Sequence, residues 1–386
     1  MKTMVLYLTF FTICSFAQPT KVELEAALAK YKVQLKELKQ RNINEYTLPG
    51  VSFFLFGMGN RSKFIYVNGK LKEALTGKII YQWDVKNELI VPNKYSVLLQ
   101  LVNGKSVRIY ENEKGLYIND ESKTTELASG DIKLPEFQNK KYSEILKVLH
   151  HEILINILDS KPLPNYFVYH KPWNRDAAIM AMVFKETGNL HLIKKWVMQL
   201  DNPFDYNNKG ISEADNPGEV LYLLSLFTDK NNPLVISTLD SAQKFIKGNH
   251  IEGKTDFGDR FVFQTKWMKY GLKSIGLPDN YEIPLQKEDN YSALFWWDYK
   301  DKHIYKGRFN IIDSKDYPYL TWAEDHFYNE TNGYVSNQIY PLSWEKNACC
   351  ANYMPMQLID PVYSELRLSV PHTWHASEMF LLLNTF

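Results

Sequence analysis

The stretch YHKPWNRDAAIMAM, residues 169–182, decides the fold expected for this chain. Pro172 precedes an apolar run with helical spacing, so the stretch predicts a buried helix that begins near Trp173. A helix start does not need an aromatic ring, a guanidinium and a carboxylate together, yet Trp173, Arg175 and Asp176 stand there. The unsatisfied N–H groups and the positive dipole end of a helix favour a polar ligand at such a position. The alternative is a capping Asp176 beside a surface Arg175.

The same pattern of a turn-rich loop followed by an apolar helix recurs along residues 140–386. The helices expected from it are WNRDAAIMAMVFKET, GEVLYLLSLFT, FQTKWMKYGLKSIG, YSALFWWDYK, PYLTWAEDHFYN and HTWHASEMFLLLN. Amphipathic stretches such as 190–200 and 235–247 lie between them. This alternation predicts an (α/α)6-type toroid with the apolar helices as its inner ring. The short segment between Gly276 and Asn290 predicts that the ring is abbreviated.

A different pattern precedes the predicted toroid. Residues 18–48 contain apolar residues at three- and four-residue spacing and predict an N-terminal amphipathic helix. Residues 49–139 contain short β-rich runs, and Asn68-Gly69 and Asn103-Gly104 each stand between two of these runs, as in tight hairpins. The predicted fold is therefore mostly α, with a small antiparallel β domain before the toroid.

The N-terminus predicts export. Lys2, an apolar run over residues 4–13 and the small residues Ser15 and Ala17 are typical of a secretory signal in residues 1–17, with cleavage near Ala17. The apolar run is too short to span a bilayer, so a soluble periplasmic or extracellular protein without a membrane span is expected.

Composition narrows the expected partners. The chain has 386 residues and a net charge of +1, which gives no bulk attraction to nucleic acid. Aromatic residues make up 14%, and Tyr and Trp present an apolar face with a polar edge, as sugar-binding surfaces do. No phosphate-binding or dinucleotide-binding glycine motif and no metal-ligand spacing is present, so no cofactor and no metal are expected. Carbohydrate is the expected partner.

Two stretches carry a resemblance to a known family. WNRDAAI resembles the W-x-R-D motif of the six-hairpin glycosidases, an α/α-toroid group that includes glucoamylases and the glucosidase domain of glycogen-debranching enzymes. VPHTWHASEMFLLL (370–383) is similar to the stretch that opens the last inner helix of glucoamylase-like proteins. The resemblance covers residues 140–386. It implies that Arg175 and Asp176 bind the non-reducing sugar and that glutamates of other loops are the catalytic acid and base.

Glycoside hydrolysis needs one carboxyl group that keeps its proton and one that is ionised, about 6.5–9.5 Å apart in inverting enzymes. Glu345 stands beside Trp344, and Glu213 comes from a different loop, so these two glutamates are the predicted acid/base pair of an inverting glycoside hydrolase. Asp215 and Glu219 have a simpler interpretation as the start of a capped helix. The predicted substrate-binding residues are Trp173, Arg175, Asp176, Asp256, Trp322, Asp325, Trp344, His372 and Trp374.

Two other functions stay open. A polysaccharide lyase would remove the proton next to a uronate carboxylate with a Tyr or His base, and the residues for it would be Tyr169, His170, Arg175 and His372. A carbohydrate-binding protein without catalysis would need the same aromatic and polar residues but no carboxylate pair.

Overall fold

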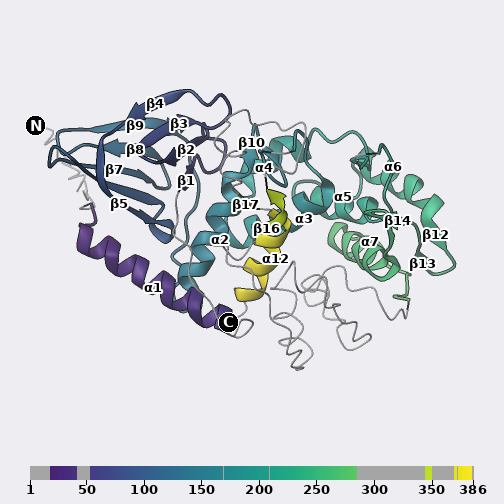
Figure 1. The fold of residues 1–386 in the computed structure, drawn as a ribbon. Coiled ribbons are helices and arrows are strands. Elements are labelled where there is room, and N and C mark those ends of the chain that lie inside the picture. The colour runs from purple at the N-terminus through teal and green to yellow at the C-terminus, as the bar shows by residue number, and fades with distance from the viewer. Residues whose placement is uncertain are drawn as a thin grey trace, which may run out of the picture.

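The structure of the chain is a computed structural model that describes residues 18–40, 53–167, 169–207, 209–284, 344–349, 369–371 and 373–384. Within these ranges, a β-rich part near the N-terminus is followed by a helical part (Figure 1). The predicted export signal, residues 1–17, lies outside the described residues. None of the helices in these ranges is both long enough and apolar enough to cross a membrane.

Two antiparallel sheets with strands in sequence order form the β-rich part. The first contains β1 (Phe53–Phe56), β2 (Phe64–Val67), β3 (Lys70–Glu73) and β4 (Ile79–Gln82). The second contains β5 (Val85–Val91), β6 (Ser96–Leu101), β7 (Ser106–Glu111), β8 (Gly115–Asn119) and β9 (Thr124–Ser129), and the 3-10 turn η1 (Pro92–Lys94) joins its first two strands. Phe56 and Tyr66 of the first sheet meet Val97 and Ile109 of the second in one apolar core. The two sheets therefore pack face to face as a sandwich.

Strand β1 is buried on both faces, which explains why its sequence FFLF is continuously apolar. Phe54 and Phe56 belong to the core between the two sheets. Phe53 and Leu55 point the other way and belong to a second core with Tyr166, at the boundary with the helical part. The first sheet is thus covered by the second sheet on one side and by the start of the helical part on the other.

Both predicted hairpin turns are confirmed. Asn68 and Gly69, with φ of 47° and 73°, connect β2 to β3 in a two-residue turn. Both residues of such a turn need positive φ, which Asn and Gly adopt at little cost. Gly104, with φ of 86°, lies in the connection between β6 and β7.

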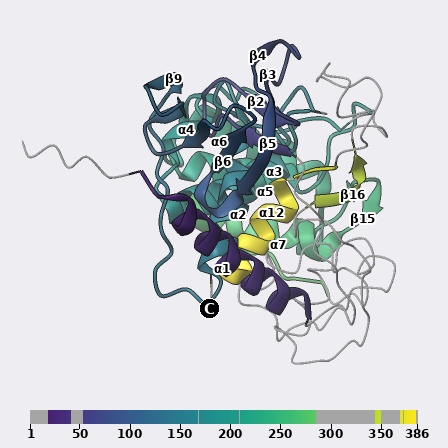
Figure 2. The same ribbon diagram turned by 60° about the vertical axis from the view of Figure 1, so that its left-hand side comes forward.

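Helix α1 (Lys21–Gln40) joins the two parts of the molecule. Leu24 and Ala27, near its N-terminus, pack against Val91 of β5. Tyr31 and Leu35, further along, belong to the core of the helical part. Helix α1 accordingly runs along the molecule from the sandwich to the helices in Figures 1 and 2.

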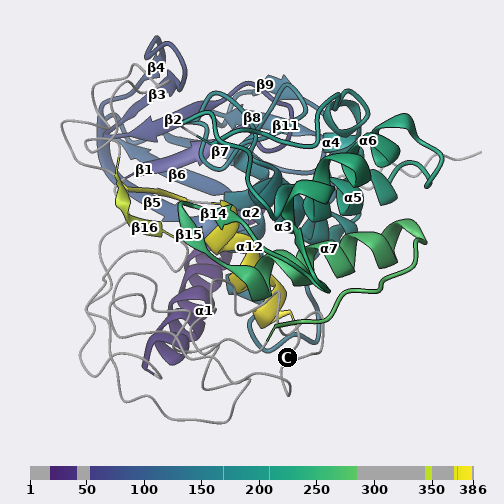
Figure 3. The same cartoon turned by 90° about the vertical axis from the view of Figure 1, so that its right-hand side faces the viewer.

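The helices of the second part pack in a spatial order that differs from their order in the sequence. They are α2 (Ser143–Ile155), α3 (Asn174–Thr187), α4 (His191–Val197), α5 (Asn216–Ser225), α6 (Pro233–Ala242), α7 (Phe261–Ile275) and α12 (Thr373–Leu383). Helix α12 lies between α2 and α3, α3 packs on α5, and α5 packs on α7 (Figure 3). Among its described residues this part also has the 3-10 turn η2 (Gln243–Phe245) and four two-stranded antiparallel sheets: β10 (Ile157–Leu158) with β11 (Lys161–Pro162), β12 (Ile246–Lys247) with β13 (His250–Ile251), β14 (Lys254–Thr255) with β15 (Gly258–Asp259), and β16 (Trp344–Cys349) with β17 (Ser369–Pro371).

Two glycines bring the backbones of α5 and α7 into direct contact. A Cβ atom on Gly218 would lie 2.3 Å from the backbone carbonyl carbon of Trp267. A Cβ atom on Gly271 would lie 2.3 Å from the backbone oxygen of Gly218. Only glycine allows this approach, because real Cβ contacts are much longer. The contact fixes the positions of the segments that precede the two helices, and those segments carry most of the candidate site.

The predicted mostly-α toroid is wrong. The structure is 39% helix and 22% strand, with a β-sandwich-like N-terminal region, and no toroid of helical hairpins is indicated within the described ranges. Four of the six predicted apolar helices exist, as α3, α5, α7 and α12, while YSALFWWDYK and PYLTWAEDHFYN lie outside those ranges. Periodicity identifies which face of a helix is buried but not which element covers it, so alternating apolar and amphipathic helices do not by themselves define a ring.

Candidate functional site

Helix α3 begins at the WNRD stretch without a cap of its own. Trp173 occupies the N-cap position and its side chain makes no capping hydrogen bond. The backbone N–H of Asn174 instead donates to Oδ2 of Asp205 over 2.7 Å. Asp205 lies in the connection between α4 and α5, so a distant carboxylate satisfies this helix start. Arg175 and Asp176, each 2% exposed, are left to point into the protein.

Arg175 is the centre of a buried network of carboxylates. Its Nε lies 2.9 Å from Oδ2 of Asp215, its Nη1 lies 2.9 Å from Oδ2 of Asp256, and its Nη2 lies 2.8 Å from Oε2 of Glu213. Oε1 of Glu219 lies 4.0 Å from Nε. The guanidinium carbon also lies 5.5 Å from the centre of the Trp374 ring. We call Arg175 with Glu213, Asp215, Glu219 and Asp256 the Arg175 cluster.

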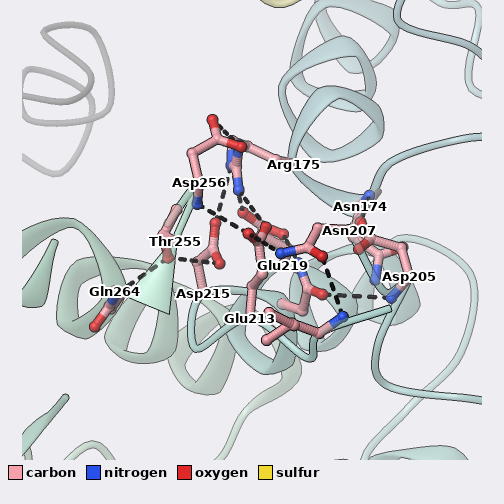
Figure 4. A network of polar contacts seen from close by, with 12 residues as sticks. Asn174, Arg175, Asp205, Asn207, Glu213, Asp215, Glu219, Thr255, Asp256 and Gln264 are labelled. Atoms are coloured by element: carbon pink, nitrogen blue, oxygen red, sulfur yellow. Dashed lines mark hydrogen bonds and ion pairs between the residues drawn. The ribbon is translucent and has the colours of Figure 1, made fainter. Parts of the chain in front are cut away.

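Three segments bring the carboxylates of the Arg175 cluster together (Figure 4). Glu213 and Asp215 come from the segment before α5, and Glu219 lies in the first turn of α5. Asp256 lies in the turn between β14 and β15. The close contact between α5 and α7 holds these segments next to one another, because β14 and β15 lead directly into α7.

Neutral donors fix the orientation of the carboxylates. Oε1 of Glu213 accepts hydrogen bonds from Nδ2 of Asn207 at 3.1 Å and from the backbone N–H of Asp256 at 2.9 Å. Oδ1 of Asp215 accepts a hydrogen bond from Oγ1 of Thr255 at 2.8 Å. Thr255 is itself held by Nε2 of Gln264 in α7. Glu213 and Asp256 are therefore linked twice, directly and through Arg175.

The capping interpretation of Asp215 does not hold. Asp215 is the N-cap residue of α5, but its side chain makes no capping hydrogen bond and binds Arg175 and Thr255 instead. Pro217 stands at the first turn, as expected. Glu219 accepts a hydrogen bond from Nδ2 of Asn216 at 3.1 Å. The local pattern thus identified the helix start correctly but not what the acidic side chains do there.

Burial keeps protons on this cluster. Burial raises the pKa of Glu213 to about 7, with Arg175 acting in the opposite direction and the nearby Asp215 raising it further. Burial, with the charge of Asp215, also raises the pKa of Glu219 well above its usual value. Burial raises the pKa of Asp205 to about 6. One guanidinium cannot balance four carboxylates, so the surplus is reduced by protonation near neutral pH.

Asp256 connects the Arg175 cluster to solvent. Its side chain is 37% exposed, whereas those of Glu213, Asp215 and Glu219 are exposed by 2% or less. Asp256 lies in the tight turn between β14 and β15 and has a φ of 45°. A molecule that approaches the cluster from solvent therefore meets Asp256 first.

The structure brings some predicted site residues together and leaves others undescribed. Glu213, Arg175, Asp256 and Trp374 meet in the cluster, and Trp173 packs edge-on against Tyr169 with ring centres 5.4 Å apart. Asp176 is buried beside them in α3. Trp344 and Glu345 belong to strand β16, but their side chains lie outside the described residues, as do Trp322, Asp325 and His372 entirely. The predicted pair of Glu213 and Glu345 thus has no measured separation.

Sequence reasoning missed the roles of Asp205, Asn207, Asp215 and Glu219. Asp215 and Glu219 carried a signal, since residues 211–224 contain three carboxylates before an apolar helix. Asp205 and Asn207 carried no local signal, because their partners lie in other segments. No group of three or more His, Cys, Asp or Glu side chains within the described ranges has an arrangement that could hold a metal ion.

Helix α12 is also tied to this region. The backbone N–H of Thr373 donates to the backbone oxygen of Pro164 at 2.9 Å, and this contact fixes the start of α12 and hence the position of Trp374.

Comparisons with family models, with curated proteins and with solved structures find no match for this chain. The resemblance to six-hairpin glycosidases is therefore wrong as an assignment, because no family model supports it and the described fold is not a helical toroid.

Proposed function

We propose that the protein is a glycoside hydrolase in which Asp256 is the carboxylate that meets the substrate. The observation that carries the proposal is the pairing of two carboxyl groups in different environments. Asp256 is partly exposed and bound to Arg175, while the adjacent Glu213 is buried and has a pKa raised to about 7. Glycoside hydrolysis requires a carboxylate that reaches the substrate, and a buried carboxyl next to it can set the local charge.

The roles follow from exposure. Asp256, partly exposed and bound to Arg175, acts on the anomeric centre or on its attacking water. Glu213, with its side chain 2% exposed, does not reach the substrate and is a positioning residue. Oε1 of Glu213 accepts a hydrogen bond from the backbone N–H of Asp256. Because the buried Glu213 carboxyl holds a proton, its charge state controls the electrostatic field at Asp256. Glu345 remains the predicted second catalytic carboxyl, and export by residues 1–17 remains part of the proposal.

The lyase alternative is weaker. A lyase must neutralise the uronate carboxylate of its substrate, and Arg175 was the predicted group for that purpose. Each of the three guanidinium nitrogens of Arg175 binds a carboxylate of the protein, at distances of 2.8 to 2.9 Å. A substrate carboxylate would have to displace one of these partners, of which Glu213 and Asp215 are buried and hydrogen-bonded elsewhere as well.

A carbohydrate-binding protein without catalysis is the second candidate, and one observation favours it. With Glu213 and Asp215 almost fully buried, the cluster presents a single carboxylate to solvent within the described ranges. Glycoside hydrolysis usually requires two catalytic carboxyl groups that reach the substrate. If Glu345 is not the second of them, the carbohydrate-binding function is favoured.

The test is a turnover assay of the purified protein on plant, algal and host glycans, with new reducing ends measured by a colour reaction and unsaturated uronates by ultraviolet absorbance. Asp256→Asn should lower kcat by about a hundredfold or more. Asp259→Asn is the matched control, because Asp259 lies in the same hairpin but pairs with Lys254 at the surface. Glu345→Gln tests the second carboxyl.

Each result has one meaning. Full turnover by Asp256→Asn would overturn the proposal. Ultraviolet absorbance by the wild-type protein would replace it with the lyase. Binding of a glycan with no product of either kind would leave the carbohydrate-binding function.

A further inference from the structure

The turn that carries Asp256 has an unusual aromatic residue beside it. Asp256 and Phe257, with φ of 45° and 63°, form the two-residue turn between β14 and β15. The turn at Asn68-Gly69 has nearly the same pair of φ values and uses residues that adopt them easily. A Phe at the second position costs about 1 kcal/mol in backbone strain. The ring gains little from burial in return, because Phe257 is 50% exposed.

A second exposed aromatic residue lies in the segment next to this turn. Tyr206 is 41% exposed and also has positive φ, at 54°. Its segment, which comprises residues 202–207 and 209–212, contains Asn207, which donates a hydrogen bond to Glu213. We call this segment together with residues 255–258 the rim of the Arg175 cluster. The rim thus holds two strained aromatic residues whose rings meet solvent rather than a core.

Three lysines, Lys209, Lys171 and Lys244, lie around the rim. Nζ of Lys209 lies 4.4 Å from the centre of the Phe257 ring. Nζ of Lys171 donates to the backbone oxygens of Asp205 and Tyr206, at 2.6 Å each. All three lysines are exposed, and none forms an ion pair with a carboxylate among the residues that the structure describes, although the charge of Lys171 acts on the buried carboxyl of Asp205.

Lys244 is held like the others by uncharged groups. Its Nζ donates to Oγ of Ser212 at 2.8 Å and lies 4.3 Å from the centre of the Phe204 ring. Aromatic rings, a hydroxyl and carbonyl oxygens orient the three ammonium groups without neutralising them. Lys254 and Lys114, also exposed, instead each form an ion pair with an aspartate. The rim therefore combines exposed aromatic rings with ammonium groups that form no ion pair.

We propose that the rim binds an anionic glycan, that is, a polysaccharide whose sugars carry sulfate or carboxylate groups. Tyr206 and Phe257 stack on sugar rings, and Lys209, Lys171 and Lys244 bind the anionic groups. The position of Phe257 directly after Asp256 places a bound sugar next to the carboxylate. This inference rests on the proposed function for its substrate class, and it adds charge to what the sequence predicted.

Binding of three polysaccharide classes at two salt concentrations tests the inference. The probes are a sulfated galactan, a polyuronate and a neutral glucan, with double-stranded DNA as a further polyanion. The Asp256→Asn protein should bind one anionic glycan class at least about tenfold more tightly than the neutral glucan, and salt should weaken that binding. The sulfated and uronate probes distinguish the two sources of negative charge.

Paired lysine variants localise the binding. Lys209→Ser with Lys244→Ser should weaken binding by about tenfold. Lys194→Ser with Lys195→Ser removes the same charge from exposed positions of α4 and should leave binding within about twofold. Thermal unfolding of both double variants checks that they fold.

Several results would overturn the inference: equal or tighter binding of the neutral glucan, equally tight binding of DNA, unchanged binding by the Lys209/Lys244 variant, or no binding of any anionic glycan. The inference and the proposed function fail separately. Tight salt-sensitive binding of an anionic glycan without turnover would reject the hydrolase alone, whereas turnover of a neutral glucan with no affinity for anionic glycans would reject the rim inference alone.

Discussion

The molecule contains two buried networks of charged residues, and they are built in opposite ways. In the β-rich part, Glu111 is surrounded by two cations, Arg61 and Lys63, and all three residues are at most 3% exposed. In the helical part, Arg175 is surrounded by four carboxylates. The first network has more cations than anions and the second has more anions than cations.

The network around Glu111 is closed. Oε1 of Glu111 accepts hydrogen bonds from Nη1 of Arg61 at 2.9 Å and from the backbone N–H of Met58 at 2.7 Å. Nζ of Lys63 donates to the backbone oxygens of Gly57 and Gly59. Burial lowers the pKa of Lys63 to about 7. Every charge is met by a counter-charge or by backbone, so this network fixes the 57–63 connection against β7.

The Arg175 cluster differs in two respects that matter for function. It holds more carboxyl groups than its single cation can neutralise, and so it stores protons near neutral pH. It also reaches solvent through Asp256. Burial and ion pairing are common to both networks, and charge imbalance together with access to solvent distinguishes the candidate site from the structural one.

The same isosteric substitution in each network gives the largest expected contrast. Glu111→Gln should lower the free energy of unfolding by about 3–5 kcal/mol, because it leaves buried Arg61 without its carboxylate and turns an amide N–H toward a backbone N–H. Chemical denaturation measures the effect. Turnover per folded molecule should not change.

Glu126→Gln is the control for this substitution, since Glu126 is exposed on β9 and its loss should cost less than about 0.5 kcal/mol. A stability of Glu111→Gln equal to that of the control would show that the network contributes little to the fold.

Glu213→Gln should have a smaller effect on stability, and one that depends on pH. In the folded chain Glu213 keeps its proton up to about pH 7, whereas the usual value is 4.5. Folding then takes up a proton between these values, so the stability linked to Glu213 is present below about pH 4.5 and is lost as pH rises to about 7. The glutamine variant does not titrate, so it should gain about 1–3 kcal/mol relative to wild type between about pH 5 and pH 8.

Denaturation of both proteins at the two pH values measures this difference, and the remaining titrating groups largely cancel between them. A gap that stays constant or narrows toward pH 8 would mean that Glu213 is ionised in the folded chain at neutral pH. Such a result would also remove the basis for its role behind Asp256.

Local features of the fold could be predicted from sequence, and features that depend on distant contacts could not. The Asn-Gly turns and the start of α5 at Pro217 follow from the residues at those positions. The partners of Arg175 lie 38, 40 and 81 residues away, and no pattern of spacing identifies them. The predicted toroid was wrong for the same reason, since the sequence marks the buried faces of helices without saying what covers them.

The candidate site was predicted in part. Arg175, Glu213 and Asp256 were each proposed from their position in turn-rich segments, and the structure brings them into contact. Their expected roles were different, however, because Arg175 was assigned to the substrate and instead binds three carboxylates of the protein. A guanidinium in a helix start gives no indication of whether its partner is a ligand or a distant segment.

The smallest expected effect on stability is that of replacing Phe257. Substitutions at this position test whether the backbone strain at Phe257 accompanies a role in glycan binding. Phe257→Gly removes about 1 kcal/mol of backbone strain but gives the unfolded chain more freedom, so the free energy of unfolding should change by less than about 1 kcal/mol. Affinity for an anionic glycan should fall by about tenfold, because a stacking ring is worth roughly 1 kcal/mol or more. Titration of the glycan into each variant measures this.

Two further substitutions at this position distinguish the ring from the backbone. Phe257→Trp keeps both the strain and a flat ring and should retain affinity, whereas Phe257→Leu keeps the strain and loses the ring and should bind as weakly as the glycine variant. If leucine bound as well as phenylalanine, the side chain would act only as apolar surface, and the contrast between this turn and the one at Asn68-Gly69 would have no functional meaning. If glycine instead lost more than about 2 kcal/mol of stability, the contact of Phe257 with Lys209 would be a structural one, and the rim would resemble the closed network around Glu111.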